Sequence, residues 1–246
     1  FSGGNSIGKW GKEYLSETSF SAIMLTMPSG VKPINIMNTV LYVCVLGDDG
    51  RVYVKGSGSN VLAQGNSTEL YNLSPILTAL NTPLENVTQL VPIDDTSPYT
   101  ADGQIYVIDS TGDLWSAGYN NHGQLGHGII TSTNFMKKVI NIGGTSTGFP
   151  VVKVWVSNHG SHTACIALDS NLKTWAWGSN LSQQRFGTLL PKGINSTPIE
   201  ITSLMLGSYP IKVNASQHDN GPGHFGANTY ILLNSGKIVT CGLNSD

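Results

Sequence analysis

Charged residues are scarce in this sequence and long apolar runs are missing. Only 11% of the 246 residues are charged, against about 25% in a typical soluble domain. The 13 Lys and Arg residues nearly balance the 15 Asp and Glu residues and are spread along the chain, which excludes the basic patch that binds nucleic acid. No apolar run approaches the roughly 20 residues of a bilayer span, so neither membrane insertion nor a signal peptide is predicted.

Paired cysteines are also missing. The three cysteines Cys44, Cys165 and Cys241 are far apart, and each lies inside an apolar run. This spacing fits neither a disulfide framework nor a zinc motif. We therefore predict reduced thiols in the protein core.

Glycine, in contrast, is abundant, and it marks an internal repeat. An apolar run, a polar turn, a second apolar run and a closing glycine follow one another from Leu41 to Gly56. The same pattern returns at 105–118, 163–178 and 230–242. The resulting marker glycines are Gly3, Gly56, Gly118, Gly178 and Gly242. Self-similarity at a period of about 60 residues indicates a repeat architecture.

Each repeat has a turn six residues before its marker glycine. Gly50, Gly112 and Gly236 occupy this position, and Leu172 replaces glycine in one copy. A glycine here suits a tight hairpin turn with a positive φ. Where leucine stands, we expect Asn171 to adopt the left-handed conformation instead.

The repeat unit is predicted to be a four-stranded antiparallel sheet. Its apolar runs, such as 175–177, do not alternate with polar residues, so both faces of the sheet should be covered. A further apolar run precedes each hairpin, at 31–36, 87–93, 151–156 and 211–215. Pro75 and Pro198 indicate a fourth, proline-led edge strand. Four such sheets around an axis form a β-propeller, and the fold class is therefore all-β.

The two ends of the chain fit the same frame. Residues 3–11 match residues 118–126 at their glycine and asparagine positions, and the sequence ends just after Gly242. Residues 1–246 thus form a single propeller domain or a segment of a larger propeller. If four units close into a ring, the N-terminal and C-terminal half-repeats complete one blade. Assembly with other chains, including a homo-oligomer, is the other alternative.

Two motifs carry a resemblance to a known family. They are Gly123-Gln124-Leu125-Gly126, and Ser161-His162-Thr163-Ala164 followed by Trp177-Gly178-Ser179-Asn180. Together with the repeat, they resemble the regulator of chromosome condensation (RCC) family. That resemblance implies a propeller, commonly of seven blades, and the family's namesake is a guanine nucleotide exchange factor for a small GTPase. An intracellular protein-interaction propeller of that kind is our alternative function.

No enzyme signature is present. The sequence has no nucleophile elbow and no phosphate-binding loop, and the adjacent carboxylates of 48–49 and 94–95 would point to opposite faces of a strand. We predict structural roles for four histidines in or near repeat landmarks, which are His122, His127, His159 and His162. His218, Asp219 and His224 could ligate a metal, but a solvated loop is favoured. No catalytic residue, cofactor or metal is predicted.

The main functional hypothesis is a non-catalytic binding or structural propeller. The composition resembles bacteriophage tail fibres, which suggests a virion or extracellular location. The expected partner is then a host surface receptor, either glycan or protein, or a neighbouring virion protein. Two repeats carry insertions, at 94–103 and 216–228, which should open on one rim of the propeller. The predicted contact residues are Asp94, Asp95, Tyr99, Asp102, His218, Asp219, His224 and Phe225.

Overall fold

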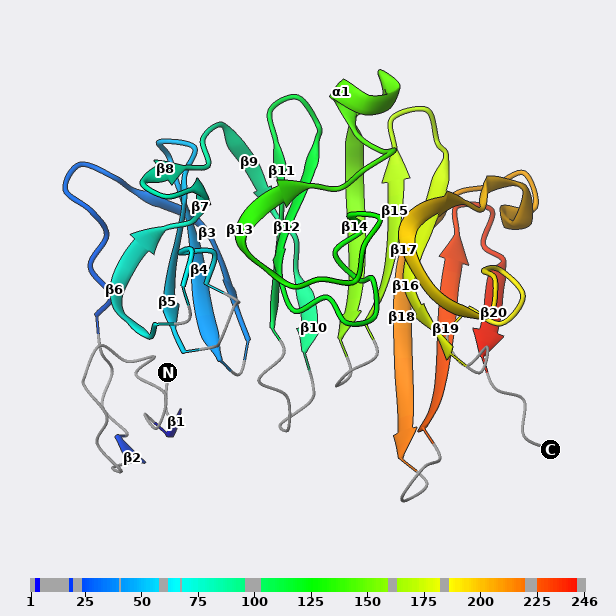
Figure 1. The fold of residues 1–246 in the computed structure, drawn as a ribbon. Coiled ribbons are helices and arrows are strands. Elements are labelled where there is room, and N and C mark those ends of the chain that lie inside the picture. The colour runs from blue at the N-terminus through cyan, green and yellow to red at the C-terminus, as the bar shows by residue number, and fades with distance from the viewer. Residues whose placement is uncertain are drawn as a thin grey trace.

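The computed structural model shows a protein built almost entirely of strands (Figure 1). It describes residues 3–4, 18–19, 24–39, 41–57, 62–66, 68–95, 103–158, 163–181, 186–219 and 225–242. Within these residues the helices are α1 (Gly144–Thr147) and the 3-10 helix η2 (Thr202–Met205). None of the described helices is long and apolar enough to cross a membrane. The all-β prediction is confirmed.

Four antiparallel sheets form successive blades. Blade 1 contains β3 (Pro33–Asn38), β4 (Tyr42–Gly47), β5 (Val52–Gly56) and β6 (Leu70–Pro75). Blade 2 contains β9 (Val87–Leu90), β11 (Gln104–Asp109), β12 (Leu114–Gly118) and β13 (Thr133–Lys138). Blade 3 contains β14 (Val151–Asn158), β15 (Ala164–Asp169), β16 (Thr174–Asn180) and β17 (Gly193–Glu200). Blade 4 contains β18 (Pro210–Asp219), β19 (Phe225–Leu233) and β20 (Ile238–Gly242).

Two pairs of short strands accompany the blades. Strand β1 (Gly3–Gly4) pairs antiparallel with β2 (Thr18–Ser19), and β7 (Leu77–Ala79) forms a hairpin with β8 (Thr82–Pro83). The β7–β8 hairpin lies in the connection that leads from blade 1 to blade 2.

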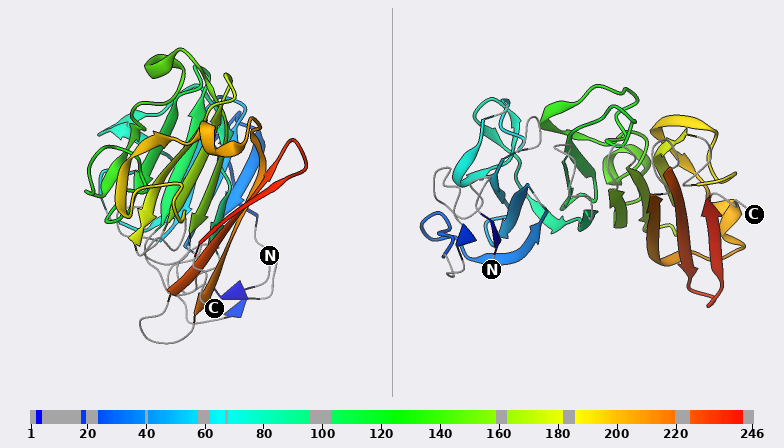
Figure 2. Two further views of the ribbon diagram at one scale, coloured as in Figure 1. Left: turned by 90° about the vertical axis from the view of Figure 1, so that its right-hand side faces the viewer. Right: turned by 90° about the horizontal axis from the view of Figure 1, so that it is seen from below.

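The blades stand along an open arc, not in a closed ring (Figure 2). Strands β3, β9, β14 and β18 begin their blades, and β1 and β20 lie at opposite ends of the arc (Figure 1). The N-terminal and C-terminal half-repeats therefore do not complete one blade in this structure.

The core fills the spaces between blades, as the apolar runs predicted. Every described residue of β4, β5 and β15 is buried. Cys44 and Cys165 are buried and Cys241 is half-buried, and all three are free thiols. Burial raises the pKa of Cys44, and it raises that of Cys241 to about 12. Cys44 and Cys165 thus lie in the core as predicted, whereas Cys241 is only half-buried.

The marker glycines that end the third strands of the blades have positive φ values. Gly118 and Gly178 have φ values of 118° and 106°. A Cβ on Gly118 would lie 2.3 Å from the Gly103 carbonyl oxygen, and one on Gly178 would lie 2.4 Å from the Thr163 carbonyl oxygen. The neighbouring strand therefore leaves no room for a side chain.

The turn of blade 3 differs from the prediction, because Leu172 and not Asn171 has the positive φ, at 61°. The Asp169 Oδ1 accepts hydrogen bonds from the backbone N–H groups of Asn171 and Lys173, both at 2.9 Å. The Leu172 N–H also donates to the Asp169 carbonyl at 3.0 Å. These bonds hold the turn in the conformation that Gly112 adopts in blade 2, whatever residue stands at the left-handed position.

Both prolines of the predicted edge strands lie later in the strand than expected. Pro75 is the last residue of β6, and Pro198 lies near the end of β17. The β16–β17 register shifts between the pairs Ala176↔Ile199 and Gly178↔Asn195. Proline is tolerated here because a bulge does not need its missing N–H.

The run at 87–93, predicted as one element, is divided between two blades. It forms β9 in blade 2, and after Pro92 the chain continues as β10 (Ile93–Asp95), which pairs in parallel with β14 of blade 3. Proline cannot donate to the ladder, so the strand changes its partner at this residue.

Candidate functional site

The arc has two faces, one at each end of the blade strands, and they differ in chemistry. One face carries the turn between the second and third strands of each blade, together with the connections 76–86, 139–150 and 201–209 (Figure 1). We call it the upper face. Backbone hydrogen bonds join neighbouring blades there. The Val87 N–H donates to the Gly50 carbonyl at 2.8 Å, and the Val151 N–H donates to the Gly112 carbonyl at 2.9 Å. The upper face therefore consists of short turns that backbone hydrogen bonds between neighbouring blades hold in place.

An aspartate organises the upper-face turn in blades 2 and 3. The Asp109 Oδ1 accepts the Thr111 N–H at 2.9 Å, and its Oδ2 accepts the Trp115 indole N–H at 2.8 Å. In blade 3, the Asp169 Oδ2 accepts the Trp175 indole N–H at 3.0 Å. These carboxylates are occupied in holding turns and indole rings, which favours a structural role over an acid–base role.

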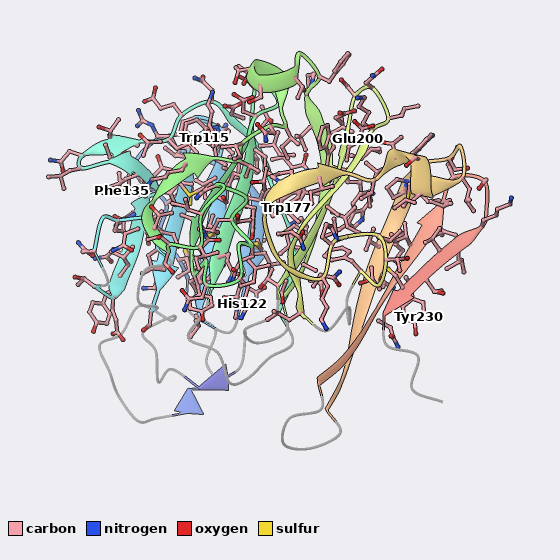
Figure 3. All side chains as sticks on the ribbon, turned by 45° about the vertical axis from the view of Figure 1, so that its right-hand side comes forward. Trp115, His122, Phe135, Trp177, Glu200 and Tyr230 are labelled. Atoms are coloured by element: carbon pink, nitrogen blue, oxygen red, sulfur yellow. The ribbon has the colours of Figure 1, made fainter. Side chains whose placement is uncertain are left out.

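Lysines cover the faces of these indole rings. Lys138 Nζ lies 5.3 Å from the Trp115 ring centroid, and Lys173 Nζ lies 6.0 Å from the Trp175 centroid. Lys173 also contacts Glu200 at 2.9 Å. Figure 3 shows Trp115 and Glu200 near the same end of the molecule. The upper face thus carries aromatic surface beside opposite charges, a mixture found in protein interfaces.

Asp113 attaches helix α1 to blade 2. Its carboxylate lies 2.5 Å from Lys138 Nζ and accepts hydrogen bonds from the Thr145 N–H at 2.8 Å and the Thr145 hydroxyl at 2.5 Å. Burial alone would raise the pKa of Asp113, but Lys138 and Thr145 outweigh it and the pKa is lowered. The carboxylate therefore stays ionised and holds the connection between blades 2 and 3 in place.

A shallow pocket of about 500 Å³ lies between blades 1 and 2 on the upper face. The β7–β8 hairpin forms one wall, and the turn at 109–111 with Trp115 forms the other. Between the two walls, the Ser110 N–H donates a hydrogen bond to the Asn86 carbonyl at 2.8 Å. A second pocket of about 510 Å³ lies between blades 3 and 4, where Trp155, Phe186 and Val213 make it more apolar.

Exposed apolar side chains stand on the upper face. Leu80 on the β7–β8 hairpin is 73% exposed, Leu206 after η2 is 66% exposed, and Leu172 is 50% exposed. Phe149 on the connection 139–150 is also exposed, and so is Leu204 on the same connection as Leu206. Every connection between described blades therefore presents an apolar group to solvent. Sequence reasoning missed the residues on the connections because they lie outside the repeat pattern, and it noted Leu172 only as a replacement for the turn glycine.

The predicted contact residues lie in or next to strands that end at the opposite face, which we call the lower face. Asp94 and Asp95 lie in β10, level with Ser157 and Asn158 of β14. In blade 4, His218, Asp219 and Phe225 belong to the paired strands β18 and β19. These residues were expected in loops, but backbone pairing continues into both insertions and makes them strands. Tyr99, Asp102 and His224 lie outside the described residues.

Strands β10 and β18 both end at the lower face (Figure 1), so the two insertions start from the same face of the arc. Their role as contact residues stays a prediction.

Of the four histidines in or near repeat landmarks, the structure describes His122 and His127. His127 Nε2 lies 2.9 Å from the Ser116 hydroxyl, and burial lowers the pKa of His127 to about 4. The backbone N–H of His122 donates to the Gln124 Oε1 at 2.9 Å. His159 and His162 lie outside the described residues. Across the described part of the chain, no three His, Cys, Asp or Glu side chains gather as metal ligands would.

Solved structures show what this architecture is similar to. Yeast RCC1 (Prp20) bound to Kap60 matches with a TM-score of 0.63 and 18% identity, over 97% of this chain and 50% of that one. The chain has the RCC1-type propeller fold. Human WBSCR16 matches with a TM-score of 0.61 and 18% identity, over 98% of this chain and 55% of that one. A second structure, of Prp20p from Saccharomyces cerevisiae, matches with a TM-score of 0.61 and 13% identity, over 99% and 51%.

This propeller chain spans about half the length of the structures it matches. No protein-family model matches the sequence, and no curated protein matches it. The RCC-type fold prediction is confirmed. The resemblance to phage tail fibres finds no support in these comparisons, which rest on fold and not on composition.

Proposed function

We propose that this chain is a non-catalytic binding propeller that holds a folded protein partner on its upper face. The observation that carries the proposal is the exposure of Leu80, Leu172 and Leu206 on turns with a rigid base. Exposed apolar groups on a well-ordered surface are typical of interaction sites, and loops on a rigid scaffold commonly carry recognition. The carboxylates nearby are occupied in turns, which favours binding over catalysis.

The pocket between blades 1 and 2 gives this surface its shape. It lies beside Leu80, and Trp115 contributes part of its wall. A partner side chain inserted there would contact apolar and polar groups together, as at the centre of a protein interface. A host surface glycan would be expected to meet a surface richer in polar groups, so of the two kinds of receptor, glycan and protein, a protein partner fits better.

Paired variants test the proposal. Leu80→Glu and Leu206→Glu place a charge on the upper face, and both residues are already exposed, so the fold should tolerate them. Ile130→Glu is the matched control, because Ile130 is 51% exposed in the connection between β12 and β13. Cross-linking capture from an extract of the source organism should yield a partner that both upper-face variants lose and the control retains. An identical set of captured proteins for all four chains would refute the proposal.

A second candidate is guanine nucleotide exchange on a small GTPase. One fold neighbour, Prp20p, is described together with its binding to Gsp1p and histones. The probe is therefore purified Gsp1p loaded with a fluorescent GDP analogue. If the chain is an exchange factor, it should accelerate release of the analogue, and Leu80→Glu should reduce the effect. An unchanged release rate at saturating chain concentration would exclude this activity towards Gsp1p.

A further inference from the structure

The space between blades 3 and 4 lacks a tyrosine that the two preceding spaces contain. Tyr42 of blade 1 and Ala164 of blade 3 lie at the same distance from their marker glycines. Tyr106 of blade 2 and Ile166 of blade 3 share a second position, two residues later on the same face of the strand. Both tyrosines are 0% exposed. Blade 3 therefore has smaller side chains at the two positions where blades 1 and 2 each have one buried tyrosine.

Each tyrosine fills the space between its own blade and the next one. The Tyr42 hydroxyl donates a hydrogen bond to the Gln104 carbonyl of blade 2. The Tyr106 hydroxyl donates to the Gln124 carbonyl at 2.8 Å and lies 3.5 Å from Cys165 Sγ of blade 3. A phenol with a hydrogen-bonded hydroxyl is thus the group that this fold places between neighbouring blades.

Between blades 3 and 4, a pocket occupies the corresponding space. Strands β14 and β18 lie side by side there (Figure 1), and Ala164 and Ile166 line a pocket of about 510 Å³. Trp155 and Phe186 add aromatic surface from blade 3, and Thr229 lines the pocket from blade 4. Ligand sites generally have volumes of about 300–1,000 Å³, so the pocket has the size of a small-molecule site.

The Thr229 hydroxyl is a buried polar group that a ligand would satisfy. Its side chain faces blade 3, because Ile231, two residues later on β19, packs in one core cluster with Ile166. Thr229 is 2% exposed, and its hydroxyl has no hydrogen-bond partner among the described residues. Leaving such a group without a partner is costly, which favours a ligand that carries a hydroxyl of its own.

Lys153 provides positive charge where the pocket meets solvent. Its Nζ lies 5.1 Å from the Trp155 ring centroid and donates to the Ile211 carbonyl at 3.2 Å. Lys153 is exposed, and it alone is charged among the lining residues that the structure describes. An ammonium group has three donors, so two of them remain for an anionic group of a ligand.

The two polar groups lie at different levels of the pocket. Thr229 occupies the repeat position of Cys165, which pairs with Val156 of β14. Val156 lies three residues after Lys153, which is about 10 Å along a strand at about 3.3 Å per residue. A benzene ring with a hydroxyl at one end and a carboxylate on a short side chain at the other has a comparable length.

We propose that the pocket between blades 3 and 4 binds a small phenolic acid. Its ring lies against Trp155, its hydroxyl bonds to the Thr229 hydroxyl, and its carboxylate pairs with Lys153. Aromatic contacts and a charge-assisted hydrogen bond together fix the orientation of such a ligand. No described lining residue belongs to the upper-face connections, so this site does not depend on the function proposed for the upper face.

Isothermal titration calorimetry of the full chain with para-hydroxyphenylpropanoate tests the proposal. Two analogues separate the contacts, because phenylpropanoate lacks the hydroxyl and tyramine carries an ammonium in place of the carboxylate. Phenylpropanoate should bind about tenfold more weakly, since one hydrogen bond is lost. Tyramine should bind more weakly than para-hydroxyphenylpropanoate as well, since its ammonium group meets the like charge of Lys153.

Three variants assign the contacts to this pocket. Ile166→Tyr introduces the phenol that Tyr106 provides in blade 2, and it should abolish binding. Thr229→Val keeps the shape of the side chain, so it should remove the difference between the two propanoates without lowering the melting temperature. Lys153→Gln should remove the preference for the carboxylate, whereas the control Lys173→Gln, at a lysine over an indole ring of the upper face, should not.

Far-UV circular dichroism checks the fold of every variant, and if Ile166→Tyr does not fold, Thr229→Val decides. No heat of binding with para-hydroxyphenylpropanoate up to about 10 mM, well above the millimolar range of weak ligands, would overturn the proposal. Equal affinities of the unaltered chain for the two propanoates, or a Thr229→Val variant that still distinguishes them, would also overturn it.

Discussion

The turn glycines provide a direct measure of how tightly the blades pack. Gly112 in blade 2 and Gly236 in blade 4 occupy the same repeat position with φ values of 78° and 80°. A Cβ on Gly112 would lie 2.3 Å from the Pro150 Cβ and 2.5 Å from the Pro150 Cα of the next blade, whereas one on Gly236 would meet nothing within 4 Å. The two alanine variants therefore share their backbone strain and differ in the contact with a neighbouring blade.

The expected losses follow from these two terms. An L-residue in the left-handed region costs roughly 1–2 kcal/mol, and the lower entropy of the unfolded alanine variant returns about 0.4–1 kcal/mol. Gly236→Ala should thus lower the free energy of unfolding by about 1 kcal/mol. Gly112→Ala adds overpacking against the Pro150 backbone, worth about 1–3 kcal/mol. Its total loss should be about 2–4 kcal/mol.

Urea unfolding followed by circular dichroism measures both values. Gly50→Ala gives an intermediate case, because its Cβ would lie 3.4 Å from the Asn86 Cα. The expected order of stability loss is Gly236→Ala, then Gly50→Ala, then Gly112→Ala. Equal losses for Gly112→Ala and Gly236→Ala would refute the reasoning, since the next blade would then have to move without cost.

Three further predictions concern single residues. Gly178→Val should lower stability by at least about 1–3 kcal/mol in the same unfolding assay, because its φ is 106°; an unchanged melting temperature would contradict this. Asp169→Ala should cost about 2–3 kcal/mol because the Trp175 indole and two backbone donors lose their acceptor, and a loss below 0.5 kcal/mol, on the order of a surface change, would contradict it. Because burial lowers the pKa of His127 from 6.5 to about 4, the unfolded chain binds a proton first as pH falls. Stability should therefore drop by up to about 1.4 kcal/mol per pH unit across that interval, and His127→Gln should show a shallower slope in urea titrations between pH 7 and 4.

Much of the blade could be read from the sequence because its determinants are local. The marker glycines stand where a strand leaves no room for a Cβ, and continuous apolar runs predicted sheets covered on both faces. The repeat asparagines are also local determinants. Asn120 and Asn180 donate from Nδ2 to the carbonyls of Ile129 and Leu190, both at 2.9 Å, and so shape the connection to the fourth strand.

Tertiary structure decided the features that depend on distant residues. Strand β10 leaves its own blade after Pro92 because β14 of the next blade offers it a partner. The placement of the blades along an arc depends on the rotation between whole blades, to which many small side-chain contacts contribute. A short sequence window encodes the strand, the turn and the glycine, but the angle between two packed sheets is the sum of contacts between residues about 60 positions apart.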